Sequence, residues 1–251
     1  MDFKKFLKRC GIVVLMFIFM VVTLNLGAAS ISVPEKFVYD LRWMGVKAGK
    51  ACLEVRNEKD KIKIVSSAHS ADWVSVFYTV DDRIESTLFK EFPVLRVGQP
   101  LKYSVKIREG RHRRNKEVLF DHEKRKATHV DHIKNETKEY NLPSYVFDPI
   151  SGFYYIRTLK LSVGESAFVK IFDSKKVWNV EVQVLRKEKV TLPMGTFDTV
   201  VVKPLMKSEG IFFAKGDIYI WLTDDARHIP VKLQTKVAVG NITATLVEGY
   251  Y

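Results

Sequence analysis

The feature that most constrains the fold is an alternation of apolar and polar residues that recurs along the 251-residue chain. Successive side chains of a β-strand point to opposite faces, so a period of two indicates strands with one buried face. Lys232, Gln234 and Lys236, for example, interleave with an apolar run and are expected to face water. The apolar runs are Phe37, Tyr39, Leu41 and Trp43; Ile62 and Ile64; Tyr103, Val105 and Ile107; Val180, Val182 and Val184; Ile218, Ile220 and Leu222; and Val231, Leu233, Val237 and Val239.

Turn-forming residues separate these runs, mostly by hairpin-sized gaps. They lie at 43–45, 57–60, 109–110, 193–195, 224–225 and 240–241. Consecutive strands joined by short turns pair antiparallel. We therefore predict a mostly β fold: an antiparallel sheet curled into a barrel, half-barrel or sandwich, with one or two short helices.

The clearer helix is predicted to begin at Asp148 and Pro149 and to end before Gly164. Asp148 can cap the first turn, and Pro149 has the fixed φ that suits the first helical position. One face carries Ile150, Phe153, Tyr154 and Leu161, so the helix could pack across the sheet or plug a barrel mouth. A weaker helical candidate, residues 72–78, also fits a strand.

The N-terminal segment has the pattern of an export signal. Lys4, Lys5, Lys8 and Arg9 precede an apolar run of 16 residues, 11–26, and small residues follow at 27–29. This pattern predicts a signal peptide over residues 1–29, cleaved after Ala29, and a single β domain over residues 30–251 in the periplasm of a Gram-negative-type bacterium. The alternative is an uncleaved inner-membrane anchor, because a spanning helix needs only roughly 17 to 25 residues.

The charge balance favours anionic partners. Removal of residues 1–29 takes away four cations and Asp2, which lowers the formal charge from +12 to +9. Such a surface suits lipid headgroups or acidic polysaccharide, whereas nucleic acid is not expected outside the cytoplasm. Direct membrane contact is expected only through the signal segment before cleavage. Cleavage also leaves Cys52 as the one cysteine, so no internal disulfide can form.

No motif in the chain indicates catalysis, a metal or another cofactor. His122, His129 and His132 are close in sequence, but on a strand His129 and His132 would point to opposite faces, which does not suit a metal. Asp224 and Asp225 could in principle split their pKa values and serve as acid and base, yet they are better explained as a polar turn between two strands. We therefore expect a protein that is not an enzyme and has no cofactor.

Two groups of residues are candidates for ligand binding. Arg111, Arg113 and Arg114 are dense enough for an anionic contact, although charges at a hairpin tip are often only solvated. Tyr219 and Trp221 lie on the strand face opposite Ile218, Ile220 and Leu222, so both faces of this strand carry apolar bulk. This predicts that one face lines a cavity; its expected lining residues are Trp43, Phe153, Tyr219 and Trp221.

Four segments together resemble an uncharacterised bacterial exported family, domain of unknown function 3108. They are FVYDLRWMGVKAG at 37–49, FDPISGFYYIR at 147–157, GTFDTVVVKP at 195–204 and YIWLTDDARHIPV at 219–231. The resemblance spans essentially the whole chain after residue 29. It implies an envelope-facing, mostly antiparallel β-domain with little helix, and it supplies no activity and no catalytic residues.

These observations lead to two functional hypotheses. A curved sheet with an apolar concave side and a helix across its opening could carry a hydrophobic ligand such as a lipid, with basic residues near an anionic headgroup. The alternative is a non-catalytic envelope scaffold or assembly protein that docks onto another protein or an anionic polymer. A carrier should have an enclosed apolar cavity, whereas a docking protein should have a filled core.

Overall fold

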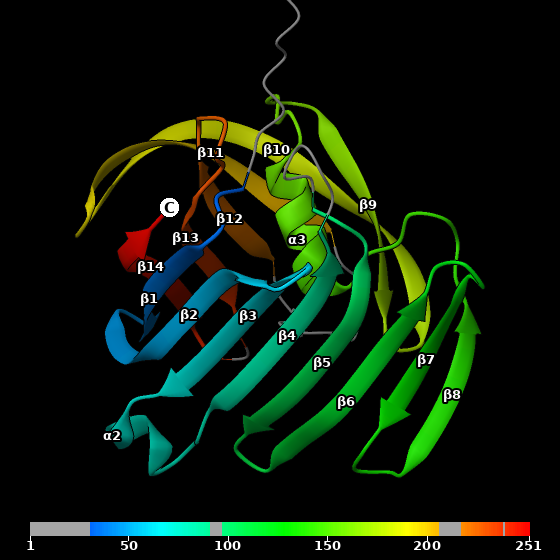
Figure 1. Ribbon diagram of the computed structural model, residues 1–251. Helices are drawn as coiled ribbons and strands as arrows, with labels where there is room; N and C mark the ends of the chain where they lie inside the picture. The colour runs from blue at the N-terminus through cyan, green and yellow to red at the C-terminus, as the bar shows by residue number, and fades with distance from the viewer. Residues whose placement is uncertain (1–30, 91–96, 206–216, 238) are drawn as a thin grey trace, which may run out of the picture.

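The computed structural model describes residues 31–90, 97–205, 217–237 and 239–251, which form fourteen strands and two short helices (Figure 1). The first half contains β1 (Glu35–Trp43), β2 (Val46–Glu58), β3 (Lys61–Ser70), α2 (Asp72–Ser75), β4 (Asp81–Phe89), β5 (Pro100–Glu109), β6 (His112–Asp121), β7 (Lys126–Asp131) and β8 (Glu136–Asn141). The second half contains α3 (Pro149–Arg157), β9 (Ser166–Asp173), β10 (Lys176–Leu192), β11 (Gly195–Leu205), β12 (Ile218–Thr223), β13 (Pro230–Lys236) and β14 (Asn241–Tyr250).

All fourteen strands belong to one antiparallel sheet. Its order is β8-β7-β6-β5-β4-β3-β2-β1-β14-β13-β12-β11-β10-β9, so the first and last strands of the chain pair at its centre. The chain therefore builds one half outward from β1 to β8, crosses through α3, and builds the other half inward from β9 to β14. Within the described residues the edge strands β8 and β9 are not paired with each other, so the curved sheet does not close into a barrel. The predicted fold class is confirmed.

Alternating burial explains why these segments form strands with a concave inner face. On β5, Tyr103, Val105 and Ile107 are buried while their neighbours are more exposed, and β10 repeats the pattern with Val180, Val182 and Val184. Each such apolar side chain stabilises the fold by about 1.5–3 kcal/mol when fully buried. The prediction that Val239 faces inward is wrong: β13 ends at Lys236, and Val239 is exposed in the turn before β14.

The helix α3 lies on the concave side of the curved sheet and joins its two halves (Figure 1). Ile150 and Tyr154 belong to a buried cluster with residues of β2–β7, whereas Ile156 belongs to a second cluster with residues of β9–β12. The helix begins as predicted: the Asp148 side chain accepts hydrogen bonds from the backbone N–H groups of Ile150 and Ser151, and Pro149 follows the cap. The weaker candidate at 72–78 also contains a helix, the single turn of α2.

The predicted signal segment, residues 1–29, lies outside the described residues, so its cleavage after Ala29 stays a prediction. In the part of the chain that the structure describes, none of the helices has the length and apolar character needed to cross a membrane.

Candidate functional site

The interior of the curved sheet, where the sequence predicts a cavity, is filled by α3 and apolar side chains. Phe153 and Ile156 of α3 face Ile171 and Ile220 across an apolar space of about 40 Å³. A second space, near Tyr154, has a volume of about 20 Å³. A ligand pocket for a small organic molecule measures roughly 300–1,000 Å³. Neither space can therefore hold an acyl chain while α3 stays in place.

The four aromatic residues predicted to line one cavity lie in separate places. Phe153 belongs to the interior of the sheet, whereas Trp221 is buried with Phe37 and Val201 in another cluster, next to the partly buried Tyr219. Trp43 is exposed at the end of β1. The alternation on β12 is as predicted, but both of its faces pack into protein, so the four residues do not line one cavity.

Two polar side chains contact the buried ring of Trp221. Its indole N–H donates a hydrogen bond to the carboxylate of Glu188 on β10. The ammonium of Lys232 lies 4.3 Å from the centre of the indole ring on the neighbouring strand β13. These contacts leave no ligand surface on the ring, since the side chain is 4% exposed.

The three arginines predicted to form an anionic contact do not converge. Arg113 is paired with Arg108 across the β5–β6 hairpin, whereas Arg114 is paired with the buried Ile107, so the two side chains point to opposite faces. Arg111 is exposed in the turn, and Arg113 closes the same turn by donating to the carbonyl oxygens of Gly110 and His112 at 2.6 and 2.8 Å.

The histidines are likewise separated. His129 is buried on the inner face of β7, while His132 lies in the following turn, 3.6 Å from a carboxylate oxygen of Glu117. His122 stacks on Phe120, with its Nε2 2.6 Å from the carbonyl oxygen of Pro100. Among the described residues, no group of three histidine, cysteine or acidic side chains has the geometry to hold a metal ion.

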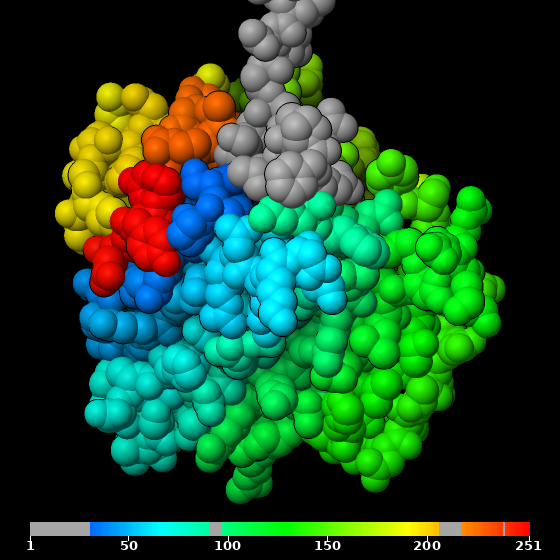
Figure 2. Space-filling model, in the orientation of Figure 1, coloured from blue at the N-terminus to red at the C-terminus, as the bar shows by residue number. Residues whose placement is uncertain are grey.

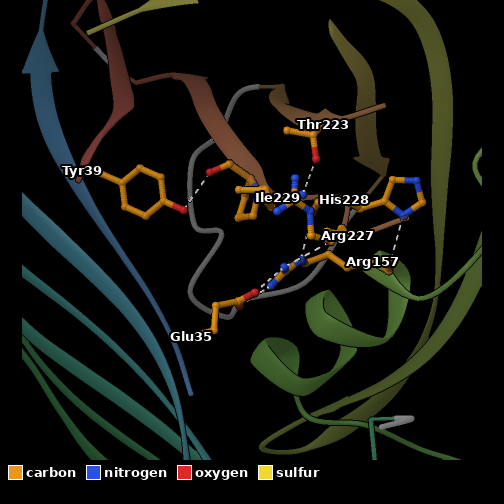
Figure 3. Close-up of polar contacts among 8 residues, drawn as sticks. Glu35, Tyr39, Arg157, Thr223, Arg227, His228 and Ile229 are labelled. Carbon is orange, nitrogen blue, oxygen red and sulfur yellow. Dashed lines mark hydrogen bonds and ion pairs between the residues drawn. The ribbon is translucent and has the colours of Figure 1, made fainter. Parts of the chain in front are cut away.

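A buried ion pair fixes the C-terminal end of α3. Arg157 donates two hydrogen bonds to the Glu35 carboxylate, at 2.7 and 2.8 Å, and both side chains are almost completely buried (Figure 3). The guanidinium also lies 4.8 Å from the ring centre of Tyr154 and 5.5 Å from that of Phe37. Burial alone would lower the pKa of Arg157, but hydrogen bonding and attraction to Glu35 raise it above the ordinary value.

The same arginine ties α3 to the loop between β12 and β13. Arg157 Nε donates to the carbonyl oxygen of His228 at 3.0 Å, and His228 Nδ1 lies 2.7 Å from the carbonyl oxygen of Arg157 (Figure 3). The loop is the polar turn that Asp224 and Asp225 predict. Burial tends to raise the pKa of Asp225, but hydrogen bonds from Thr223 and Arg227 hold it below its ordinary value. These residues build a structural turn and leave no converging pair of carboxylates.

A second buried anchor fixes the N-terminal end of α3. Ser86 on β4 donates a hydrogen bond of 2.5 Å to Asp148, the residue that caps the helix. Both side chains are fully buried, and burial raises the pKa of the Asp148 carboxyl even though four hydrogen bonds oppose the rise. The helix is thus bonded at one end to β4 and at the other to β1 and the β12–β13 loop.

In contrast to this closed interior, one end of the sheet carries a group of exposed apolar side chains, which we call the apolar rim. Figure 1 shows the β1–β2 turn on the left, α2 below it at the lower left and the β5–β6 turn at the bottom, and Figure 2 shows the α2 segment on the surface at the lower left. Phe77 is 84% exposed and Val76 77%. The apolar rim consists of Trp43, Met44, Val46, Trp73, Val76, Phe77, Tyr78 and Val239.

Hydrogen bonds join the loops of the apolar rim into one surface. The β13–β14 turn meets the β1–β2 turn where Trp43 Nε1 donates to the carbonyl oxygen of Val239 at 2.8 Å. The β1–β2 turn meets α2 where Trp73 Nε1 donates to the carbonyl oxygen of Lys47 at 3.0 Å. The residues after α2 meet the β5–β6 turn through the N–H of Gly110, which donates to Thr79.

Comparison with known proteins identifies the family. The model of a family described as "Protein of unknown function (DUF3108)" matches residues 38–247. The chain belongs to this family. The resemblance predicted from the four sequence segments is therefore confirmed, and it spans nearly all of the described structure. No curated protein matches the chain in sequence.

Three solved structures are similar to this DUF3108 chain, at 11–14% identity, and each comparison covers 88% of the chain. A β-barrel-like protein of domain of unknown function DUF1849 from Brucella abortus has a TM-score of 0.56 with 98% of its length covered, which shows a shared fold. A protein from Bacteroides fragilis, inferred to be exported and having a YmcC-like fold, has a TM-score of 0.34 with 98% covered. An inferred lipoprotein from Parabacteroides distasonis has a TM-score of 0.35 with 97% covered.

The sequence predicts Asp148 as the cap of α3, but not its hydrogen bond to Ser86, the Glu35–Arg157 pair or the apolar rim of this DUF3108 domain. Glu35 and Arg157 are 122 residues apart, and nothing local in either segment indicates that they pair. Trp43, Met44 and Gly45 are predicted to form a turn, and apolar residues in a turn are a sequence signal of exposed apolar surface. Val76 and Phe77 gave no such signal, since their segment fits either a helix or a strand.

Proposed function

We propose that this protein is a non-catalytic docking protein of the cell envelope, which binds another envelope component through the apolar rim. The observation that carries the proposal is that eight of the 17 large apolar side chains exposed in the described residues lie on adjoining loops at one end of the sheet. Contiguous exposed apolar surface marks interaction sites, because leaving it in water is unfavourable. Export is supported by the signal pattern in residues 1–29.

The filled interior favours docking over the other hypothesis, a carrier for a hydrophobic ligand. A carrier that held its ligand inside the curved sheet would have to displace α3, because the interior spaces measure only about 40 and 20 Å³. Displacement would break the Glu35–Arg157 pair and the Ser86–Asp148 hydrogen bond, both of which are buried. Breaking a buried ion pair alone costs about 3–5 kcal/mol, which a hydrophobic ligand would have to offset on binding.

Site-specific photo-crosslinking in growing cells tests the proposal. A photoreactive phenylalanine analogue at Phe77 should crosslink to an envelope component, because this side chain is exposed on the apolar rim. The matched control is the analogue at Phe168, which is 56% exposed on β9 but lies outside the rim. Equal crosslinking at both positions, or none at Phe77, would contradict a docking role. A stoichiometric lipid extracted from the purified protein would instead support the carrier hypothesis.

A further inference from the structure

We propose that the partner of the apolar rim is an anionic lipid surface, into whose headgroup layer the rim side chains insert. This inference rests on the proposed docking function and deepens it by naming the partner. It also departs from the sequence-based expectation that membrane contact occurs only through the signal segment.

The first argument is the kind of side chain exposed. Trp73, Phe77 and Tyr78 stand close together after β3, and Trp43 and Met44 extend the surface through the β1–β2 turn. Tryptophan and tyrosine are enriched where a membrane meets water, since their rings are apolar and carry one polar group. The exposed aromatic residues of the rim are therefore of the type that a lipid headgroup layer accepts.

The second argument is that the polar groups within the rim are already paired. The indole N–H groups of Trp43 and Trp73 donate to backbone carbonyl oxygens of neighbouring loops, so neither ring needs water for its hydrogen bond. The backbone N–H groups of Met44, Phe77 and Tyr78 also donate to carbonyl oxygens within the rim. An unpaired polar group is expensive to bury, so these bonds lower the cost of moving the rim out of water.

A glycine permits part of this packing. Gly110 has a φ of +55°, and a Cβ there would lie 2.7 Å from Cε2 of Tyr78. The absence of a side chain lets the Tyr78 ring lie against the β5–β6 turn. The turn that carries Arg111 and Arg113 thereby becomes continuous with α2 and its exposed aromatic residues.

The third argument is charge complementarity. The four rim segments, 42–47, 71–82, 108–113 and 236–241, contain six cationic residues and four acidic ones, Asp72, Asp81, Asp82 and Glu109, and so carry a net positive charge. The cations are Arg42, Lys47, Arg108, Arg111, Arg113 and Lys236. Lysines and arginines near an anionic membrane surface contribute to binding, and this contribution weakens as salt increases. Cations that surround exposed aromatic residues suit anionic headgroups above an apolar layer.

The fourth argument separates a lipid surface from a protein partner. The rim side chains project from the β1–β2 turn, the β13–β14 turn and the α2 segment as separate tips. Between the two turns lies one open groove of about 750 Å³, lined by Arg42, Met44, Lys236 and their neighbours. A protein partner would need a surface shaped to these separate tips, as packing at stable interfaces matches that of protein interiors. A fluid headgroup layer adapts to them without a matching shape.

Vesicle co-sedimentation tests the inference, with the protein from Ser30 onward, the form that signal cleavage would release. We expect binding to vesicles of phosphatidylglycerol and phosphatidylcholine, and much weaker binding to phosphatidylcholine alone. Phe77→Ser should weaken binding about tenfold through the loss of one buried aromatic side chain. Replacing Arg111, Arg113 and Lys236 together by glutamine should weaken it on the order of a hundredfold at low salt.

The matched control is Phe168→Ser, which removes an equally large exposed side chain outside the rim and should leave vesicle binding unchanged. Absence of binding to anionic vesicles, or equal effects of the two serine variants, would overturn the lipid inference. If vesicles are not bound but Phe77 crosslinks to a discrete envelope protein in cells, the docking function stands and only its lipid partner is wrong. If both experiments fail, both proposals fall.

Discussion

The surroundings of α3 and the apolar rim both depart from the usual distribution of side chains: charged groups are buried around α3, and large apolar groups are exposed at the rim. Around α3, Glu35, Arg157 and Asp148 are buried, whereas at the rim Trp73 and Phe77 are exposed. Each buried charge has several hydrogen-bond partners within the chain, which identifies it as part of the structure. The exposed rings gain little from the fold, because much of their surface still contacts water. The comparison separates residues that hold the protein together from residues available to a partner.

The largest expected effect tests the structural side of this comparison. Arg157→Ala should lower the free energy of unfolding by about 3–5 kcal/mol, because it leaves the Glu35 carboxylate buried without its cation. Urea denaturation followed by circular dichroism measures the change. The double variant Glu35→Leu with Arg157→Met should recover much of the loss, since it removes both charges. A loss of less than about 1 kcal/mol in the single variant would show that the pair does not hold α3 in place.

The anchor at the other end of α3 should have a smaller effect. Asp148→Ala removes the helix cap and leaves the buried Ser86 hydroxyl without its acceptor, so we expect a loss of about 2–3 kcal/mol. Asp148→Asn, which keeps an acceptor oxygen for the backbone, is the matched control and should cost less. Equal losses in the two variants, measured by urea denaturation, would show that the carboxylate charge, and not the cap, is what the helix requires.

The sequence predicts the strands and the start of α3 better than it predicts the buried anchors of α3 and the apolar rim. Alternation identifies strands such as β5 and β10 because burial of one face repeats every second residue, and Asp148 with Pro149 identifies the start of α3. The pairing of Glu35 with Arg157 depends on how the two halves of the sheet curve around the helix, which no local pattern records. Trp221 shows the same limit: alternation predicts its face of β12, but not the Glu188 and Lys232 side chains that fill the space beside it.

Asp82 is an intermediate case, a half-buried carboxylate near the rim whose neighbours include the acids Asp81 and Glu109. Burial first, and then Glu109, raise the pKa of Asp82 to about 6, although a hydrogen bond from the Arg108 N–H opposes the rise. A carboxyl whose pKa is higher in the folded state favours folding when protonated. Its ionisation should therefore reduce stability progressively as the pH rises from about 4 to about 6.

Asp82→Asn should thus stabilise the protein at neutral pH and change little below pH of about 4. We expect a gain of about 1 kcal/mol above pH of about 6, less than the pKa shift alone implies, because solvent screens a group that is only half buried. Thermal melting of both proteins across this range provides the measurement. A difference that stays constant with pH would mean that Asp82 is not the titrating group.

The smallest expected change in stability is at the rim, and it bears most directly on the comparison. The double variant Val76→Ser with Phe77→Ser should change the free energy of unfolding by no more than about 0.5 kcal/mol, as exposed substitutions usually do. The paired control in the interior is Ile150→Ser, which places a hydroxyl among buried side chains and should be strongly destabilising. If urea denaturation shows that the rim variant loses as much as the interior one, its side chains belong to the core of a larger folded unit. If the free energy of unfolding hardly changes while vesicle binding is lost, the apolar side chains of Val76 and Phe77 serve contact with a partner, because the fold does not need them.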